Sequence, residues 1–279
     1  MVSTGATWGS SAHGHRVEVR FHGSLGELVV SQRRGHTHPV EVRGHTHRVE
    51  VAPGTTVKDL IESLGVPHTE VDVIVVDGTS VGFGHQVADG ETVGVYPMAG
   101  AVDVTPVLHL QPSPPGRPAF VVDVHLGRLA RSLRLLGFDV LWRNDLTDSE
   151  LAAISAGDRR ILLTRDRQLL KRSQVATGYL VRSTERHVQL AEVLARYDLA
   201  DRIAPFGRCL ACNGLLEDVA KDVVAGRLPP RARRDYTEFR QCPDCGRIYW
   251  RGSHYDRLAT VVEEVRRKAR GTGPPTSAP

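Results

Sequence analysis

Four cysteines, all that the chain contains, occur as two C-x-x-C motifs. Cys209 and Cys212 lie in RCLACNG, and Cys242 and Cys245 lie in QCPDCGR after 29 intervening residues. Asn or Gly follows each motif, as tight turns favour. Four thiolates at this spacing are typical of tetrahedral Zn²⁺ coordination that leaves no position for water. We therefore expect a structural zinc site in a ribbon, and disulfides are the less favoured alternative.

Aspartates follow the predicted buried strands downstream of residue 117. Asp123 ends the apolar run AFVVD, Asp166 follows RRILLTR, and Asp145 and Asp148 lie in the loop after FDVLWR. The carboxyl ends of parallel strands meet at one end of a sheet, so we expect these carboxylates to converge. A Mg²⁺ or Mn²⁺ ion would offset their mutual repulsion and support phosphodiester hydrolysis. The alternative for any single aspartate is a helix cap or a turn.

Basic and aromatic residues surround these candidate sites. The arginines are predicted to contact RNA phosphates, with a solvated helix face as the alternative for each one; they are Arg128, Arg131, Arg134, Arg165 and Arg167. Tyr249, Trp250 and Tyr255 follow the second cysteine pair, where they either stack on RNA bases or form the core of the small ribbon.

Alternating strands and helices must position the aspartates. Strand-like runs alternate with amphipathic helical patterns, which predicts an α/β unit with a largely parallel sheet. The predicted strands are 119–124, 138–143, 159–166 and 179–182, and the predicted helices are 125–137 and 149–157.

The first hundred residues follow a different pattern, with two strands, a helix and two more strands. This order, with PGTTVKDLIESLGVP and DGETVGVYP, resembles the β-grasp fold of ubiquitin-like and sulfur-carrier proteins. Sulfur carriers end in a free Gly-Gly, whereas this chain continues through YPMAGAVDV, which argues against a carrier role. The repeat RGHTHPVEV–RGHTHRVEV pairs His36 with His38 and His45 with His47. Solvent-facing histidines of a duplicated hairpin are favoured there over a weak metal site.

Charge divides the chain into two parts. From Arg117 onward, 29 Lys and Arg against 20 Asp and Glu give +9, which leaves −5 (7 against 12) for residues 1–116. A basic part suits a polyanionic partner such as nucleic acid, and a solvated surface rich in arginine is the alternative. No apolar run reaches the length of a membrane span and no secretory signal is recognisable, so we expect a cytoplasmic protein with no membrane partner.

Several ordered motifs resemble the Mut-seven C-terminal RNase family, a PIN-like nuclease domain fused to a zinc ribbon. They are FVVDVHLGRLARSLRLLGFDV, DSELAAISAGDRRILLTRDRQLL, RCLACNG and CPDCGRIYWRGSH. The resemblance implies a divalent-metal site at Asp123, Asp148 and Asp166, with Asp145 and Glu150 as weaker candidates. Many PIN-like relatives carry another acid two residues beyond the T-x-D aspartate, where this chain has Gln168.

These observations predict a PIN-like parallel sheet with helices on both faces, followed by a zinc ribbon and preceded by a ubiquitin-like domain. The expected domains are a β-grasp domain (15–100), a proline-rich linker (101–117), a nuclease domain (118–204), a zinc ribbon (205–260) and a basic C-terminal helix and tail (261–279). We expect a metal-dependent ribonuclease. The alternatives are a non-catalytic RNA-binding or ribosome-associated module and an adaptor that recruits a protein partner through its ubiquitin-like domain.

Overall fold

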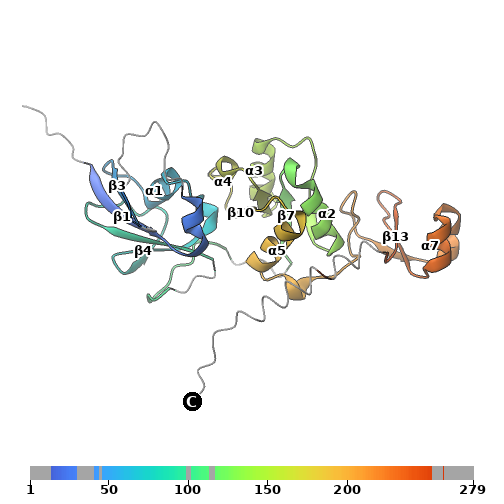
Figure 1. Ribbon diagram of the computed structural model, residues 1–279. Coiled ribbons are helices and arrows are strands. Elements are labelled where there is room, and N and C mark those ends of the chain that lie inside the picture. Colours follow the sequence, from blue (N-terminus) through green and yellow to red (C-terminus); the bar gives the residue numbers. More distant parts are fainter. Residues whose placement is uncertain are drawn as a thin grey trace, which may run out of the picture. The chain divides into compact units, whose positions relative to one another are not determined.

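The computed structural model describes residues 14–29, 41–43, 46–98, 102–112, 117–252 and 260. The chain divides into two compact units, Met1–Gln111 and Pro112–Pro279. The first unit has one sheet, drawn in blue to blue-green, and the second unit has two sheets, drawn in green to orange (Figure 1). Among the described helices, none has the length and apolar character needed to cross a membrane.

The first unit is a β-grasp domain with a six-stranded sheet in the order β2-β3-β1-β6-β4-β5. The strand β1 runs antiparallel to β3 and parallel to β6, and β6 runs antiparallel to β4. The strands are β1 (His15–Phe21), β2 (Glu41–Arg43), β3 (Thr46–Val51), β4 (Val71–Val76), β5 (Thr79–Val81) and β6 (Thr92–Pro97); the helices are η1 (Gly23–Leu28), α1 (Val57–Ser63) and η2 (His68–Glu70). The β-grasp prediction is confirmed, and two short strands, β2 and β5, add to the expected order.

Alternation of apolar residues fixes which face of this sheet is buried. Val17, Val19 and Phe21 of β1 all lie inside the core, because residues two apart in a strand face the same way. The side chain of Thr56 begins α1 by accepting the N–H of Asp59 at 3.2 Å.

The histidine repeat differs from its prediction at the position that the structure describes. His47 lies on the inner face of β3, 5% exposed, with its ring edge-on to Phe21 at a centroid distance of 5.8 Å. The prediction of a solvent-facing histidine is therefore wrong for His47, because it shares the strand face of buried Val49 and Val51. His36, His38 and His45 lie outside the described residues.

The segment after β6 returns to the first unit. The N–H of Leu110 donates to the carbonyl of Asp72 at 2.7 Å, and His109 contacts the Asp72 carboxylate at 2.7 Å. The buried Gln111 side chain donates to the carbonyls of His68 and Val71. The expected linker, 101–117, thus includes residues that are bound to the first unit.

The second unit begins with a four-stranded parallel sheet in the order β10-β9-β7-β8. Its α2 packs against α5, and its α3 packs against β7 and β9. The strands are β7 (Ala119–Val122), β8 (Asp139–Leu141), β9 (Ile161–Thr164) and β10 (Gly178–Leu180); the helices are η3 (Val124–Leu126), α2 (Gly127–Leu135), α3 (Asp148–Gly157), α4 (Arg167–Leu170), α5 (Arg186–Arg196) and η4 (Ala200–Arg202). The connection from β7 to β8 and the connection from β8 back to β9 run in opposite directions across the sheet, so the usual right-handed crossover places their helices on opposite faces.

The core of this sheet requires a glycine between α2 and β8. Gly137 has a φ of +88°, and a Cβ at that position would collide with the carbonyl of Ala204. We expect Gly137→Ala to lower the free energy of unfolding of the second unit by at least about 2 kcal/mol. Alanine is disfavoured at a positive φ, and its Cβ would also clash with the backbone of Ala204. Chemical denaturation measures this change.

Gly157→Ala is the matched control for Gly137→Ala. Gly157 ends α3, and an added Cβ would meet nothing within 4 Å. We expect this substitution to be neutral or to stabilise the unit by up to about 1 kcal/mol, since alanine loses less backbone entropy in a helix. Equal destabilisation by both substitutions would contradict the packing argument.

The ribbon follows as a three-stranded antiparallel sheet in the order β11-β12-β13, with a helical insertion between its first two strands. One of its two small cores contains Cys209, Cys242 and Leu216, and the other lies around Phe239. The strands are β11 (Glu217–Val219), β12 (Phe239–Gln241) and β13 (Ile248–Tyr249); the helices are α6 (Lys221–Val224), η5 (Ala225–Arg227) and α7 (Pro230–Asp235).

Candidate active site and metal-binding cysteines

Two aspartates lie at the carboxyl ends of the two central strands of the parallel sheet. Asp123 follows β7 directly, and Asp166 lies two residues beyond the end of β9. The connection after β7 leads to β8 on one side, and the connection after β9 leads to β10 on the other side. Ligand sites of open α/β sheets lie at such a switch point, where successive connections leave in opposite directions.

Thr164 links these two aspartates. Its hydroxyl donates to Oδ2 of Asp123 at 2.5 Å and accepts the N–H of Asp166 at 2.9 Å. Thr164 is 0% exposed and Asp123 is 7% exposed, so burial shelters this contact from water. The sequence RRILLTRD contains a signal that Thr164 orients the site, because Thr164 is a polar residue at the end of an otherwise apolar strand.

Both aspartates also cap the turns that follow them. Asp123 accepts the N–H of His125 at 3.3 Å, and Asp166 accepts the N–H of Gln168 at 2.7 Å. The capping alternative is therefore present in the structure, together with the placement at the switch point. These bonds orient each carboxylate and leave further oxygen lone pairs for a ligand.

The other acidic candidates form no close cluster with this pair among the described residues. Asp148 begins α3 on the surface, and its carboxylate lies 4.0 Å from the guanidinium of Arg172. The exposed Asp145 forms two hydrogen bonds with Arg143, at 2.9 and 2.6 Å, which hold the pKa of Asp145 below its usual value. Glu150 accepts the N–H and the hydroxyl of Thr147 in a capping box.

The expected gathering of three or four carboxylates is therefore not found. Among the described residues, the group of three or more His, Cys, Asp or Glu side chains with donor atoms within 4.8 Å of one another is the cysteine cluster. The acidic site consists of Asp123 and Asp166, joined through Thr164, with Asp148 at the same end of the sheet. Two carboxylates fit a cation that keeps several waters, as Mg²⁺ does.

The predicted RNA-binding arginines separate into two groups. Arg128 and Arg131 on α2 and Arg165 after β9 are exposed, and Arg167 is half-buried. Arg134 is 3% exposed, and the prediction that it contacts RNA is wrong. Its guanidinium donates to the carbonyls of Val140, Leu210 and Ala211 at 2.8 to 3.2 Å. Burial lowers the pKa of Arg134, and the cysteines and Asp139 nearby oppose this effect.

The four cysteines are positioned to bind a metal. Sγ of Cys209 lies 3.5 Å from Sγ of Cys245, and Sγ of Cys212 lies 3.4 Å from Sγ of Cys242. All four sulfurs lie within 4.8 Å of one another. Zn–S bonds of about 2.3 Å place tetrahedral sulfurs roughly 3.8 Å apart, so this arrangement is consistent with a structural zinc ion.

Two similar turns bring the cysteines together. Asn213 and Gly246 have positive φ values of 72° and 71°, and their N–H groups donate to the carbonyls of Cys209 and Cys242. The hydroxyl of Tyr249 contacts Sγ of Cys209 at 3.0 Å. Tyr249 therefore packs in the ribbon core, one of the two roles predicted for the aromatic residues after the second cysteine pair.

Burial and hydrogen bonds act in opposite directions on the thiols. Burial disfavours the Cys209 thiolate, but the N–H of Cys212 and the hydroxyl of Tyr249 stabilise it and lower the pKa of Cys209 to about 6. Burial is the largest cause that raises the pKa of Cys212 to about 12. A bound cation would favour deprotonation of the whole cluster.

The first cysteine turn also covers the edge strand β8. Asn213 accepts the N–H of Val140 at 3.0 Å and donates to Asp139 at 2.9 Å. Arg160 and Arg208 also contact Asp139, at 2.7 and 3.3 Å. Edge strands need such protection, and here it also joins the ribbon to the sheet. Sequence reasoning missed this role of Asn213 and Asp139.

This network predicts an acid sensitivity of folding. Burial raises the pKa of Asp139, but hydrogen bonds from Arg160 and Asn213 outweigh burial and leave the pKa below its usual value. The stabilisation is therefore complete above the unfolded-state pKa of about 3.9, and it is lost as the pH falls further, through the lower folded-state pKa. We expect Asp139→Asn to lower the thermal midpoint at pH 7 and to reduce its decline below pH 4. Thermal unfolding across pH measures both effects, and parallel curves for the two proteins would contradict the assignment.

Comparisons with known proteins agree with this architecture. Residues 118–262 match the family described as Mut7-C RNAse domain, and residues 14–103 match the family described as Mut7-C ubiquitin. No curated protein matches the chain. The crystal structure of H. volcanii small archaeal modifier protein 1 is similar over 30% of this chain and 98% of that chain, with 19% identity and a TM-score of 0.23. Because the first family match spans more than half of the chain, the protein belongs to the Mut7-C RNAse domain family and carries a Mut7-C ubiquitin domain ahead of its nuclease domain.

Proposed function

We propose that this protein is a metal-dependent ribonuclease that hydrolyses RNA phosphodiester bonds at Asp123 and Asp166. The observation that carries the proposal is the placement of Asp123 and Asp166 at the switch point of a parallel sheet, where the buried hydroxyl of Thr164 donates to the Asp123 carboxylate and accepts the backbone N–H of Asp166. Membership of an RNase domain family supports the same reaction class.

We assign a separate role to each residue of this site. Asp123 and Asp166 would hold Mg²⁺ or Mn²⁺, which supplies charge stabilisation for the phosphate and lowers the pKa of water. Thr164 and the N–H of His125 fix the orientation of the Asp123 carboxylate. Exposed Arg165 would bind the RNA backbone beside this pair.

The ribbon would add affinity for RNA. We infer that its four cysteines bind zinc and keep four protein ligands, a structural role with no open position for water. The second unit carries the positive charge of the chain, at 29 basic against 20 acidic residues from Arg117 onward, and this charge would attract RNA.

Cleavage of labelled single-stranded RNA tests the proposal. We expect product with added Mg²⁺ or Mn²⁺ and none without an added divalent cation. Because Asp145 and Asp148 pair with Arg143 and Arg172, the specific rival is a non-catalytic RNA-binding module. Binding that weakens with salt and gives no product in either metal would favour that rival and refute the ribonuclease.

A further inference from the structure

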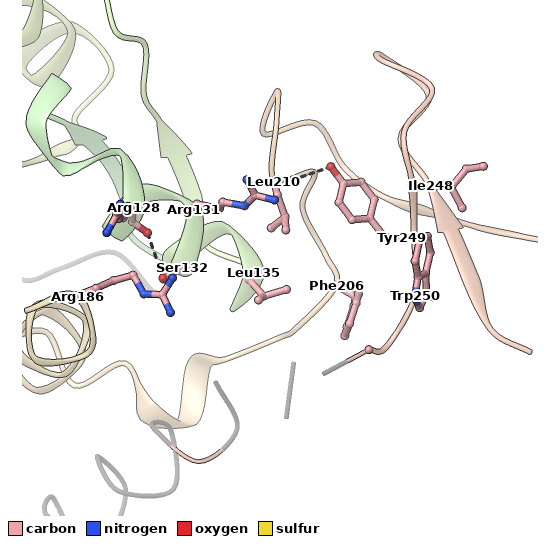
Figure 2. Close-up of a pocket in the computed structure, with 11 residues that line it drawn as sticks. Arg128, Arg131, Ser132, Leu135, Arg186, Phe206, Leu210, Ile248, Tyr249 and Trp250 are labelled. Atoms are coloured by element: carbon pink, nitrogen blue, oxygen red, sulfur yellow. Dashed lines mark hydrogen bonds between the residues drawn. The ribbon is translucent and has the colours of Figure 1, made fainter. Parts of the chain in front are cut away.

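A pocket of about 400 Å³ lies in the second unit between α2 and the ribbon, away from the acidic pair. Figure 2 shows Arg128 and Arg186 on the helix side, and Phe206, Tyr249 and Trp250 on the ribbon side. The pocket therefore combines an aromatic wall with a basic rim.

Contacts behind the aromatic wall hold it in place. The ring of Trp250 packs against Tyr236 and Phe239 in the ribbon core, at centroid distances of 6.4 and 6.3 Å. Phe206 has a φ of 60°, which bulky residues rarely adopt, and its carbonyl accepts a bond from Arg240 at 2.8 Å. Such backbone strain persists only where surrounding structure enforces it, and it occurs often at binding sites.

The basic rim carries charge without an acidic partner. Arg128 and Arg131 project from successive turns of α2, and Arg186 begins α5. All three are exposed, and within the described part of the chain they form no ion pair. A pocket that is apolar inside and positively charged at its mouth complements a flat apolar ligand that carries negative charge.

We propose that this pocket binds one unpaired base of a single-stranded RNA, with Arg128, Arg131 and Arg186 on the adjoining phosphates. Arg128 and Arg131 lie on α2, which follows Asp123 through the short helix η3. The inference rests on the proposed function and deepens it, because it makes the substrate single-stranded. Bases inside a duplex are stacked and paired, so they cannot enter.

Crosslinking to the full-length chain tests the position of the base. The probe is an oligouridylate that contains 4-thiouridine, bound without added Mg²⁺ or Mn²⁺. We expect crosslinked peptides that contain Phe206 or Tyr249 and Trp250. Crosslinks confined to other segments would overturn the inference.

Affinity measurements test the contacts. Stacking on an aromatic side chain predicts that Trp250→Leu, at a half-buried aromatic residue of the wall, weakens binding of the oligouridylate by roughly tenfold, with the zinc content of the protein as the control for folding. The triple variant R128Q/R131Q/R186Q should weaken binding further and reduce the salt dependence by about three phosphate contacts. R231Q/R233Q/R234Q, at three exposed positions on α7, is the matched charge control and should change affinity by less than about threefold.

The outcomes separate this inference from the proposed function. Crosslinks in the pocket with no cleavage in any metal would support the base site and refute the ribonuclease. Cleavage with unchanged affinity in Trp250→Leu, or equal affinity for duplex RNA, would overturn the base site alone. A concentration-dependent dimer that these substitutions abolish, with RNA affinity unchanged, would assign the pocket to a second copy of the chain and overturn the inference.

Discussion

Asp123→Asn should reduce the rate of metal-dependent RNA cleavage by about a thousandfold or more. The substitution keeps the shape of the side chain and removes the charge that would hold the cation. A bound metal stabilises the transition state by several kcal/mol, and about 4 kcal/mol corresponds to a thousandfold change in rate. The rate of single-turnover cleavage in saturating Mg²⁺ or Mn²⁺ measures the effect.

Asp145→Asn is the matched control for Asp123→Asn. It removes the same charge from an exposed carboxylate that pairs with Arg143. An exposed pair contributes little to stability, so we expect less than a threefold change in cleavage rate. Equal rates for wild type and Asp123→Asn would remove the catalytic assignment of the switch-point pair, and a large loss in Asp145→Asn would move the site to the loop after β8.

Thr164→Val refines this comparison. It leaves both carboxylates and removes the hydroxyl that donates to Asp123 and accepts from Asp166. We expect a smaller loss in cleavage than that of Asp123→Asn, with a higher metal concentration at half-maximal rate, because the hydroxyl orients a carboxylate and does not hold the cation itself. A metal titration of the cleavage rate measures both quantities.

Loss of the ribbon metal should have the largest effect on folding. We expect one zinc ion per chain in the wild type and none that is stably bound in Cys212→Ser. Structural zinc contributes apparent binding free energies of about 10–16 kcal/mol in small domains. The two small cores of the ribbon do not replace this energy, so the ribbon should unfold. Metal analysis and circular dichroism measure the two changes.

The effect should extend beyond the ribbon into the parallel sheet. The carbonyls of Leu210 and Ala211, which lie between the first two cysteines, accept hydrogen bonds from buried Arg134. Unfolding of this turn would remove these two hydrogen-bond acceptors from the buried guanidinium of Arg134, and an unsatisfied buried charge costs several kcal/mol. We therefore expect a lower thermal midpoint for the whole second unit. Asp235→Asn, which removes an exposed contact with Arg234 in the same ribbon, is the control.

The sequence allowed a correct prediction of those features that depend on local pattern. Alternating apolar residues indicated the strands, and the cysteine spacing indicated a four-sulfur cluster, because both signals are complete within short segments. The placement of Asp123 and Asp166 followed in the same way from the ends of two apolar runs.

Partners from distant segments were beyond the reach of such patterns. Arg134 has the spacing of Arg128 and Arg131, yet two of its hydrogen-bond acceptors lie 76 and 77 residues further along the chain. The position of Asp145 was correctly assigned to a loop, but its pairing with Arg143 depends on side-chain conformation. His47 is buried because the register of β3 against β1 determines which face of the sheet it occupies. Neither repeat unit determines that register by itself.

The return of Gln111 and His109 to Asp72 affects where the chain can be divided. Asp72 is 6% exposed, and its carboxylate contacts His109 and accepts the N–H of Gln111. A recombinant fragment that ends at residue 100 or 103 would keep this buried carboxylate and lose both of these hydrogen-bond partners. A fragment that extends through Gln111 retains those groups. Isolated preparations of the amino-terminal domain should therefore differ in solubility and melting temperature according to a stretch of only eight residues, 104–111.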